Sequence, residues 1–173
     1  MAYVIDFQGF RSFSSEFVFK EVAILSTEKG AQPRVFLFKP PHGWNQLPSK
    51  LKSENRWLEK NYIGISWSEG DIPYDELKAT LQDALKNSTK VFVKGGEKKR
   101  LLDKIIPNVE DLEAYGSPSI SHLCKDAHGH CSHHTLCVNA RCAAQTVHCI
   151  REWMDYGRAR TSVDKDVVDS MYN

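Results

Sequence analysis

The sequence lacks any apolar run that approaches the roughly 20 residues needed to cross a bilayer, so no membrane-spanning helix is expected. It also lacks an excess of either charge: 23 Lys and Arg oppose 22 Asp and Glu, for a formal net charge of +1. Overall charge therefore points to no nucleic-acid partner, and any basic surface must be local. The first ten residues, MAYVIDFQGF, have neither the basic start nor the apolar stretch of a signal peptide. An intracellular, reducing location, cytoplasmic or nuclear, is expected.

The chain shows no internal repeat and no low-complexity block. Its 173 residues, 41% of them hydrophobic, suit one compact domain, because domains cluster at roughly 100–150 residues. We expect this domain over residues 1–157 and a polar C-terminal tail over residues 158–173.

Cysteine and histidine are unevenly distributed. All five cysteines and six of the seven histidines lie between His122 and Cys149. A bound metal and a disulfide-linked loop are the two competing causes. Five is an odd number, so complete disulfide pairing leaves one thiol over, and a reducing location disfavours disulfides. The segment therefore favours a metal, and mixed thiolate and imidazole ligands favour zinc.

The strongest ligand pair within this segment is Cys131 and His134, because a C-x-x-H step lets one tight turn direct two side chains at one ion. Cys142, eight residues beyond His134, is the natural third ligand. A closed tetrahedral site needs a fourth, which the segment by itself leaves open.

Other members of the segment are alternative ligands. Cys124 with His128 forms a rival pair, and Cys137 replaces Cys142 if the loop closes locally. Cys149 lies two helical turns after Cys142, where packing in the core is the simpler interpretation.

Apolar patterning predicts five strands and several helices. The strands are expected at residues 3–7, 16–25, 35–38, 91–93 and 109–112, with a turn at Gly9. Helices are expected at residues 46–62, 74–87, 101–106 and 142–156. Three consecutive strands followed by alternating helices and strands indicate an α/β fold with a mixed sheet.

Five short motifs follow one another along these elements. They are Asp6-Phe7-Gln8, Glu21-Val22-Ala23, Ile63-Gly64-Ile65, Gly95-Gly96-Glu97 and the run from Arg141 to Thr146. In this order the motifs resemble those of DEDD-type exonucleases, over residues 3 to about 156. The resemblance implies a ribonuclease-H-like, exonuclease-type mixed sheet of five strands flanked by helices.

The Cys/His segment further resembles two zinc-containing families of that fold, the Maelstrom domain and the exonuclease domain of arenavirus nucleoproteins. Both hold zinc by Glu, Cys, His and Cys. Matched by motif, this resemblance implies one structural zinc ion bound by four residues, Glu21, Cys131, His134 and Cys142. Glu21 then supplies the fourth ligand, and zinc accepts a carboxylate oxygen. A salt bridge of Glu21 to Lys20 or Arg34 is the alternative.

The catalytic positions implied by the resemblance are degenerate. They are Asp6, Gln8, Glu97, Arg141 and Thr146. Two-metal phosphoryl chemistry needs carboxylates around two divalent ions and a base for water. Gln8 is neutral, Arg141 stays protonated where the base should be, and Thr146 replaces an acid. Loss of these groups resembles Maelstrom domains more than arenavirus nucleoproteins.

A basic run flanks this expected cleft. Together with Arg141 it comprises Lys94, Lys98, Lys99 and Arg100. Such a run either binds phosphates, helped by the amides of Gly95 and Gly96, or is a solvated helix face. We expect a pseudo-nuclease that binds single-stranded RNA or serves as an adaptor in an RNA-silencing type of pathway. A residual ribonuclease and a protein-interaction module are the alternatives.

Overall fold

A mixed sheet of five strands forms the centre of the computed structural model, which describes residues 1–127 and 131–171, with side chains as far as residue 157. The sheet order is β3-β2-β1-β4-β5. The strands span Ala2–Arg11 (β1), Phe17–Ser26 (β2), Arg34–Leu37 (β3), Lys90–Val93 (β4) and Val109–Asp111 (β5). The first three pair antiparallel, whereas β4 and β5 join β1 in parallel. The predicted α/β class, with a mixed five-stranded sheet flanked by helices, is confirmed.

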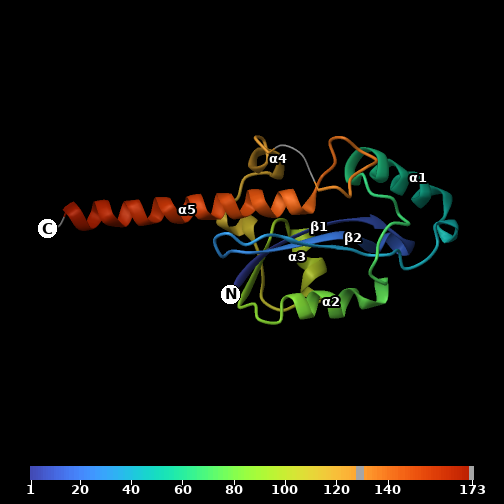
Figure 1. Cartoon of the computed structure of the whole chain (residues 1–173), viewed down its shortest axis with the longest axis horizontal. Helices are drawn as coiled ribbons and strands as arrows, with labels where there is room; N and C mark the ends of the chain where they lie inside the picture. Colours follow the sequence, from blue (N-terminus) through green and yellow to red (C-terminus); the bar gives the residue numbers. More distant parts are fainter. Residues whose placement is uncertain (128–130, 172–173) are drawn as a thin grey trace.

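Helices cover both faces of this sheet (Figure 1). The α-helices span Ser49–Leu58 (α1), Leu77–Ala84 (α2), Gly96–Asp103 (α3), Ile120–Leu123 (α4) and Ala143–Met171 (α5). A π-helical turn, Glu59–Ile63 (η3), follows α1, and short 3₁₀ turns lie at Phe13–Ser15 (η1), Trp44–Gln46 (η2), Tyr74–Glu76 (η4) and Leu112–Tyr115 (η5). One face packs against α2 and α3, and the other packs against α5. No helix among the described residues is both long and apolar enough to cross a membrane.

The alternation of side chains along β1 determines which residues lie on each face of the sheet. Ile5 and Phe7 join the core under α2 and α3, and Val4 joins the core under α5. Because successive side chains of a strand point to opposite faces, Asp6 and Gln8 lie on the α5 face with Val4. Both are at least 95% buried. Two polar side chains are therefore buried between the sheet and α5.

The same alternation separates Lys20 from Glu21 in β2. Lys20 is fully buried, and its ammonium donates hydrogen bonds to the carbonyls of Phe38 and Trp67 at 2.8 and 2.7 Å, and to that of Glu69. These hydrogen bonds of the buried ammonium anchor the loop before α2 to the sheet. Glu21 points to the opposite face, so the alternative salt bridge between Glu21 and Lys20 is not formed.

The turn predicted at Gly9 is wrong, because β1 continues through this residue to Arg11. The pairing register with β2 shifts between Gln8 and Gly9, which marks a β-bulge. A Cβ atom on Gly9 would lie 2.0 Å from the carbonyl oxygen of Val18. Glycine is thus needed here for close approach of two strands.

Other boundaries also differ from the sequence expectation. Helix α3 begins at Gly96 and ends at Asp103, earlier than the predicted 101–106, because its first turns are polar and lack apolar periodicity. The one-turn helix α4 was not expected. Helix α5 continues to Met171, past the predicted end at Tyr156 and through the segment expected to be a tail (Figure 1). His128 and His130 lie outside the described residues.

Candidate metal centre

The loop that precedes α5 is held against the turn after α1 by backbone hydrogen bonds. The amide of Leu136 donates to Gly64 O at 3.0 Å, and that of Arg141 donates to Tyr62 O at 2.7 Å. Gly64 has a φ of +71°, and a Cβ atom there would lie 3.0 Å from Cβ of Ala140. Glycine has no Cβ atom and adopts a positive φ without strain, so Gly64 lets the loop lie close to the η3 turn.

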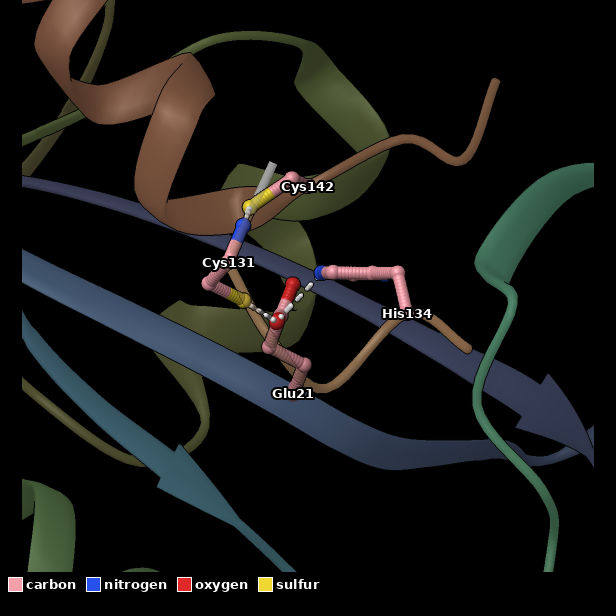
Figure 2. Close-up of side chains that lie close together, drawn as sticks. All are labelled: Glu21, Cys131, His134 and Cys142. Atoms are coloured by element: carbon pink, nitrogen blue, oxygen red, sulfur yellow. Dashed lines mark hydrogen bonds and ion pairs between the residues drawn. The ribbon is translucent and has the colours of Figure 1, made fainter. Parts of the chain in front are cut away.

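Four side chains from three segments converge beneath this loop (Figure 2). Glu21 comes from β2, Cys131 and His134 come from the loop, and Cys142 directly precedes α5. One ligand atom from each lies within 4.8 Å of all the others. Glu21, His134 and Cys142 are buried, and Cys131 is partly buried. Sequence positions 110 residues apart are thus brought into one cluster.

The carboxylate of Glu21 is at the centre of this cluster. Its Oε1 accepts a hydrogen bond of 2.7 Å from the amide of Ala143, the first residue of α5. A negative charge at a helix N-terminus is favoured by the helix dipole. Its Oε2 lies 3.3 Å from Cys131 Sγ and 2.8 Å from His134 Nε2. One oxygen therefore anchors α5, and the other faces the remaining ligands.

The orientation of His134 leaves Nε2 for the cluster. Its Nδ1 lies 2.6 Å from the carbonyl oxygen of Ile63. A carbonyl only accepts, so Nδ1 carries a proton and Nε2 is the nitrogen that would offer its lone pair to a metal ion. Metal-binding histidines commonly donate their second nitrogen to such a carbonyl, which fixes tautomer and ring orientation. The Ile63-Gly64 segment thus orients a ligand, a role that no side-chain pattern in the sequence indicates.

The ligand set matches one metal ion. Tetrahedral zinc with bonds of about 2.0–2.3 Å to O, N and S holds its ligand atoms roughly 3.3–3.8 Å apart. The 4.8 Å limit on this cluster admits a single ion of that size. Two soft sulfurs, one imidazole and one carboxylate suit a transition metal better than magnesium or calcium, which prefer oxygen. The cluster can hold one metal ion.

The electrostatics of the cluster also favour a cation. The Cys131 thiol donates a hydrogen bond that lowers the pKa of Cys142 to about 3, against the effect of burial. Burial acts to lower the pKa of His134, but hydrogen bonds with Cys142 and Glu21 outweigh it and raise that pKa to about 10. Protons on His134 and Cys131 thus balance anionic groups in a buried site. A divalent metal ion displaces such protons when it binds, which makes metal affinity fall in acid.

Asp6, which the resemblance predicts as the first catalytic carboxylate, is paired with a lysine. Lys98 Nζ lies 2.6 Å from Asp6 Oδ1 and also donates to Phe7 O at 2.9 Å. Burial raises the pKa of Asp6, and the Lys98 ammonium acts in the opposite direction. An ammonium on this carboxylate opposes binding of a divalent cation there.

The other positions predicted from the resemblance are Gln8, Glu97, Arg141 and Thr146. Gln8 lies next to Asp6, with Nε2 at 3.4 Å from Asp6 Oδ2. Thr146 is buried in α5, and Glu97 is exposed and bonded to Arg11 at 2.8 Å. The guanidinium of Arg141 lies 5.9 Å from the ring centroid of Tyr62.

The predicted basic run is divided between inward and outward side chains. Lys94 is almost buried and bonds to Ser117 Oγ at 3.1 Å, and Lys98 points to Asp6. Lys99 pairs with Asp103 on α3 at 2.7 Å. Arg100 is exposed. Lys94 and Lys98 therefore have structural contacts, which leaves Lys99, Arg100 and Arg141 nearer the surface.

Of the alternative metal ligands, Cys124 and Cys137 are not part of the cluster, and His128 lies outside the described residues. Cys137 packs beside Gly64, and Cys124 contacts Cys149. Among the described residues, Glu21, Cys131, His134 and Cys142 make up the one group of three or more potential ligands that could share an ion.

Comparison with family models finds no match to this sequence, and comparison with curated proteins finds no significant match.

Replacement of Lys98 by methionine tests the Asp6 ion pair. The change leaves a buried carboxylate without its partner and is expected to destabilise the protein by about 2–3 kcal/mol at pH 7, below the ~3–5 kcal/mol of a fully buried pair because Lys98 is partly exposed. Without Lys98, burial raises the pKa of Asp6 in the folded protein above its value in the unfolded chain. The native state then binds the Asp6 proton more readily than the unfolded state, so the free energy of unfolding falls as pH rises. The deficit should therefore be larger at pH 7 than near pH 4, as measured by urea unfolding.

The double change Asp6→Asn with Lys98→Met is the matched control. It removes both charges and should recover most of the lost stability at pH 7. An equal deficit at both pH values, or no recovery in the double variant, would contradict the ion-pair account.

Proposed function

We propose that this chain is a catalytically inactive domain of ribonuclease-H-like, exonuclease type that is stabilised by one zinc ion and acts by binding RNA. The observation that carries the proposal is the Lys98 ammonium seated on Asp6, in the position of the first catalytic carboxylate. The resemblance to Maelstrom domains suggests a role in an RNA-silencing type of pathway, either as an RNA binder or as an adaptor.

Two features of the fold support the exonuclease-type assignment. The sheet has the order β3-β2-β1-β4-β5, with an antiparallel meander followed by two parallel strands. The motif residues Asp6 and Gln8 of β1, Glu21 of β2 and Thr146 of α5 all lie between the sheet and α5. Gln8 is also the direct cross-strand neighbour of Glu21.

Loss of nuclease chemistry is supported by charge. A two-metal centre needs several carboxylates around ions roughly 4 Å apart. Here one buried carboxylate, Asp6, faces an ammonium and the neutral amide of Gln8. Arg141 cannot serve as a general base, since its guanidinium stays protonated.

Zinc is the metal that the ligand set supports best. Zinc has no geometric preference that arises from its d-electrons, and it accepts sulfur, nitrogen and oxygen ligands together in a tetrahedral site. The four side chains of this cluster offer that mixture of ligand atoms. A closed set of four protein ligands is typical of a structural site. The ion would tie β2 to the loop at Cys131 and His134 and to the start of α5, so it would contribute directly to folding stability.

Elemental analysis of protein purified without chelator should find one zinc ion per chain. Cys131→Ser should remove the zinc and lower the free energy of unfolding by about 3 kcal/mol or more, because a structural metal is coupled to folding. Cys137→Ser, in the same loop but outside the cluster, is the matched control and should retain zinc. Zinc-free wild-type protein, or full zinc content in Cys131→Ser, would refute the assignment.

A labelled single-stranded oligonucleotide tests the absence of exonuclease activity. With Mg²⁺ or Mn²⁺ the wild-type protein should produce no ladder of shortened products, since the Lys98 ammonium is paired with Asp6 and the neutral Gln8 lies beside it. Asp6→Asn, which keeps the shape of the side chain, separates a contaminant from real activity. A ladder that the wild type produces and Asp6→Asn does not would establish a residual ribonuclease.

RNA binding is supported by a hollow of about 320 Å³ beside the start of α5. Tyr62 and Arg141 both line it, and the Tyr62 ring is 38% exposed. An exposed aromatic ring with a guanidinium over it suits stacking of an unpaired base and contact with its phosphate.

Tyr62→Ala should weaken binding of single-stranded RNA by roughly 1–3 kcal/mol, the typical contribution of one base–aromatic stack. Arg141→Ala should make the log–log salt dependence shallower by about 0.7 for each phosphate that the guanidinium had neutralised. Lys78→Ala on α2, an exposed lysine on the opposite face of the sheet, is the matched control and should change neither quantity. Fluorescence anisotropy at several salt concentrations measures both.

A protein-interaction module is the second candidate, and one observation favours it. Val138, which lines the same hollow, is 89% exposed, and Leu136 nearby in the loop is 48% exposed. Exposed apolar side chains at a hollow are typical of protein contacts. If the wild-type protein binds no RNA even at low salt, this candidate replaces RNA binding.

A further inference from the structure

Two cysteines outside the metal cluster lie in contact with each other. Cys124 is the C-terminal cap of α4, and Cys149 lies in α5 two turns after Cys142. Helix α4 packs against α5, and Cys124 lines the same hollow as Gln145, which precedes Cys149 by one helical turn. Both thiols are free. The odd cysteine count is thereby divided into two metal ligands, one contacting pair and the single Cys137.

The two thiols differ in access to solvent. Cys124 is partly exposed and lines the hollow of about 320 Å³ together with Tyr62 and Arg141. Cys149 is 7% exposed and lines a second hollow on the other side, of about 600 Å³. A small oxidant therefore reaches Cys124 first, and Cys149 is placed to react with whatever forms there.

We propose that Cys124 and Cys149 form a redox-active dithiol, in which a peroxide oxidises Cys124 and Cys149 then closes a disulfide between α4 and α5. The proposal concerns residues that belong to neither the metal cluster nor the degenerate catalytic set. It does not depend on RNA binding.

The chemistry balances with one peroxide for two thiols. The Cys124 thiolate attacks one peroxide oxygen, the O–O bond breaks, and the leaving hydroxide takes up a proton to become water. The resulting sulfenic acid is attacked by the Cys149 sulfur, the S–O bond breaks, and a second water leaves. The two sulfurs lose two electrons and two protons in total, and hydrogen peroxide is reduced to two molecules of water.

The surroundings of Cys124 favour its thiolate. The hydrogen bond from Cys149 lowers the pKa of Cys124, burial opposes this, and the Arg141 guanidinium adds to the lowering. The same hydrogen bond raises the pKa of Cys149. The thiolate is the reactive form of cysteine, and Cys124 is the more exposed of the two, so Cys124 is the attacking residue and Cys149 the resolving one.

The cross-link would change the hollow that Cys124 lines. It ties the end of a one-turn helix to the long helix α5, beside Arg141 and Gln145. A ligand that occupies this hollow would then bind differently to the oxidised and the reduced protein.

The test uses the full chain in its metal-loaded form, treated with a small excess of hydrogen peroxide and digested without reductant. Mass spectrometry should find peptides joined through Cys124 and Cys149, separated again by dithiothreitol, with metal content unchanged. In Cys149→Ala, which keeps the buried position apolar, the cross-link should be absent and a sulfenic-acid probe such as dimedone should label Cys124. Cys137→Ala is the matched control and should form the cross-link as the wild type does.

Three outcomes would overturn the proposal. One is a wild-type protein in which Cys124 and Cys149 stay reduced under these conditions. The second is oxidation that begins at Cys137, or at Cys131 and Cys142 with loss of metal. The third is a second metal ion per chain that Cys124→Ala removes, which would make the pair a metal site.

Discussion

The fully buried carboxylate of Glu21 is the group on which the arrangement of this protein depends. A charged group without solvent is costly unless it is paired, hydrogen-bonded or bound to a metal. Glu21 meets this requirement by accepting the first amide of α5 with one oxygen and facing Cys131 and His134 with the other. One side chain in β2 thereby fixes where α5 begins and where the loop before it lies.

Asp6, on the same face of the sheet, meets the same requirement in a different way. Its partner is the Lys98 ammonium, which comes from the first turn of α3. The two buried carboxylates are thus each neutralised, one within a cluster suited to a metal ion and one by a lysine. This difference separates a cluster that can hold a metal ion from a carboxylate whose ammonium partner opposes cation binding, although the two carboxylates lie on neighbouring strands.

The segment rich in cysteine and histidine serves several purposes in the folded chain. Cys131, His134 and Cys142 belong to the cluster, whereas Cys124 and Cys149 form a separate thiol pair. Residues of one segment are separated because the loop folds toward Glu21 while α4 packs against α5. The crowding of cysteine and histidine in the sequence indicated metal chemistry. Which thiols lie together could be seen only from the positions of α4 and α5.

The sequence by itself determined the class of the fold and most of its elements, because period-2 and period-3.6 apolar patterns report directly which faces are buried. It also indicated Cys131 and His134 as a pair, since a C-x-x-H step is local, and Glu21 entered through a resemblance of motifs. The bulge at Gly9, the carbonyl of Ile63 behind His134 and the ammonium of Lys98 on Asp6 were decided only by the tertiary structure. Each of these depends on a backbone group or a side chain from a distant segment, and a linear pattern carries no information on which distant groups meet.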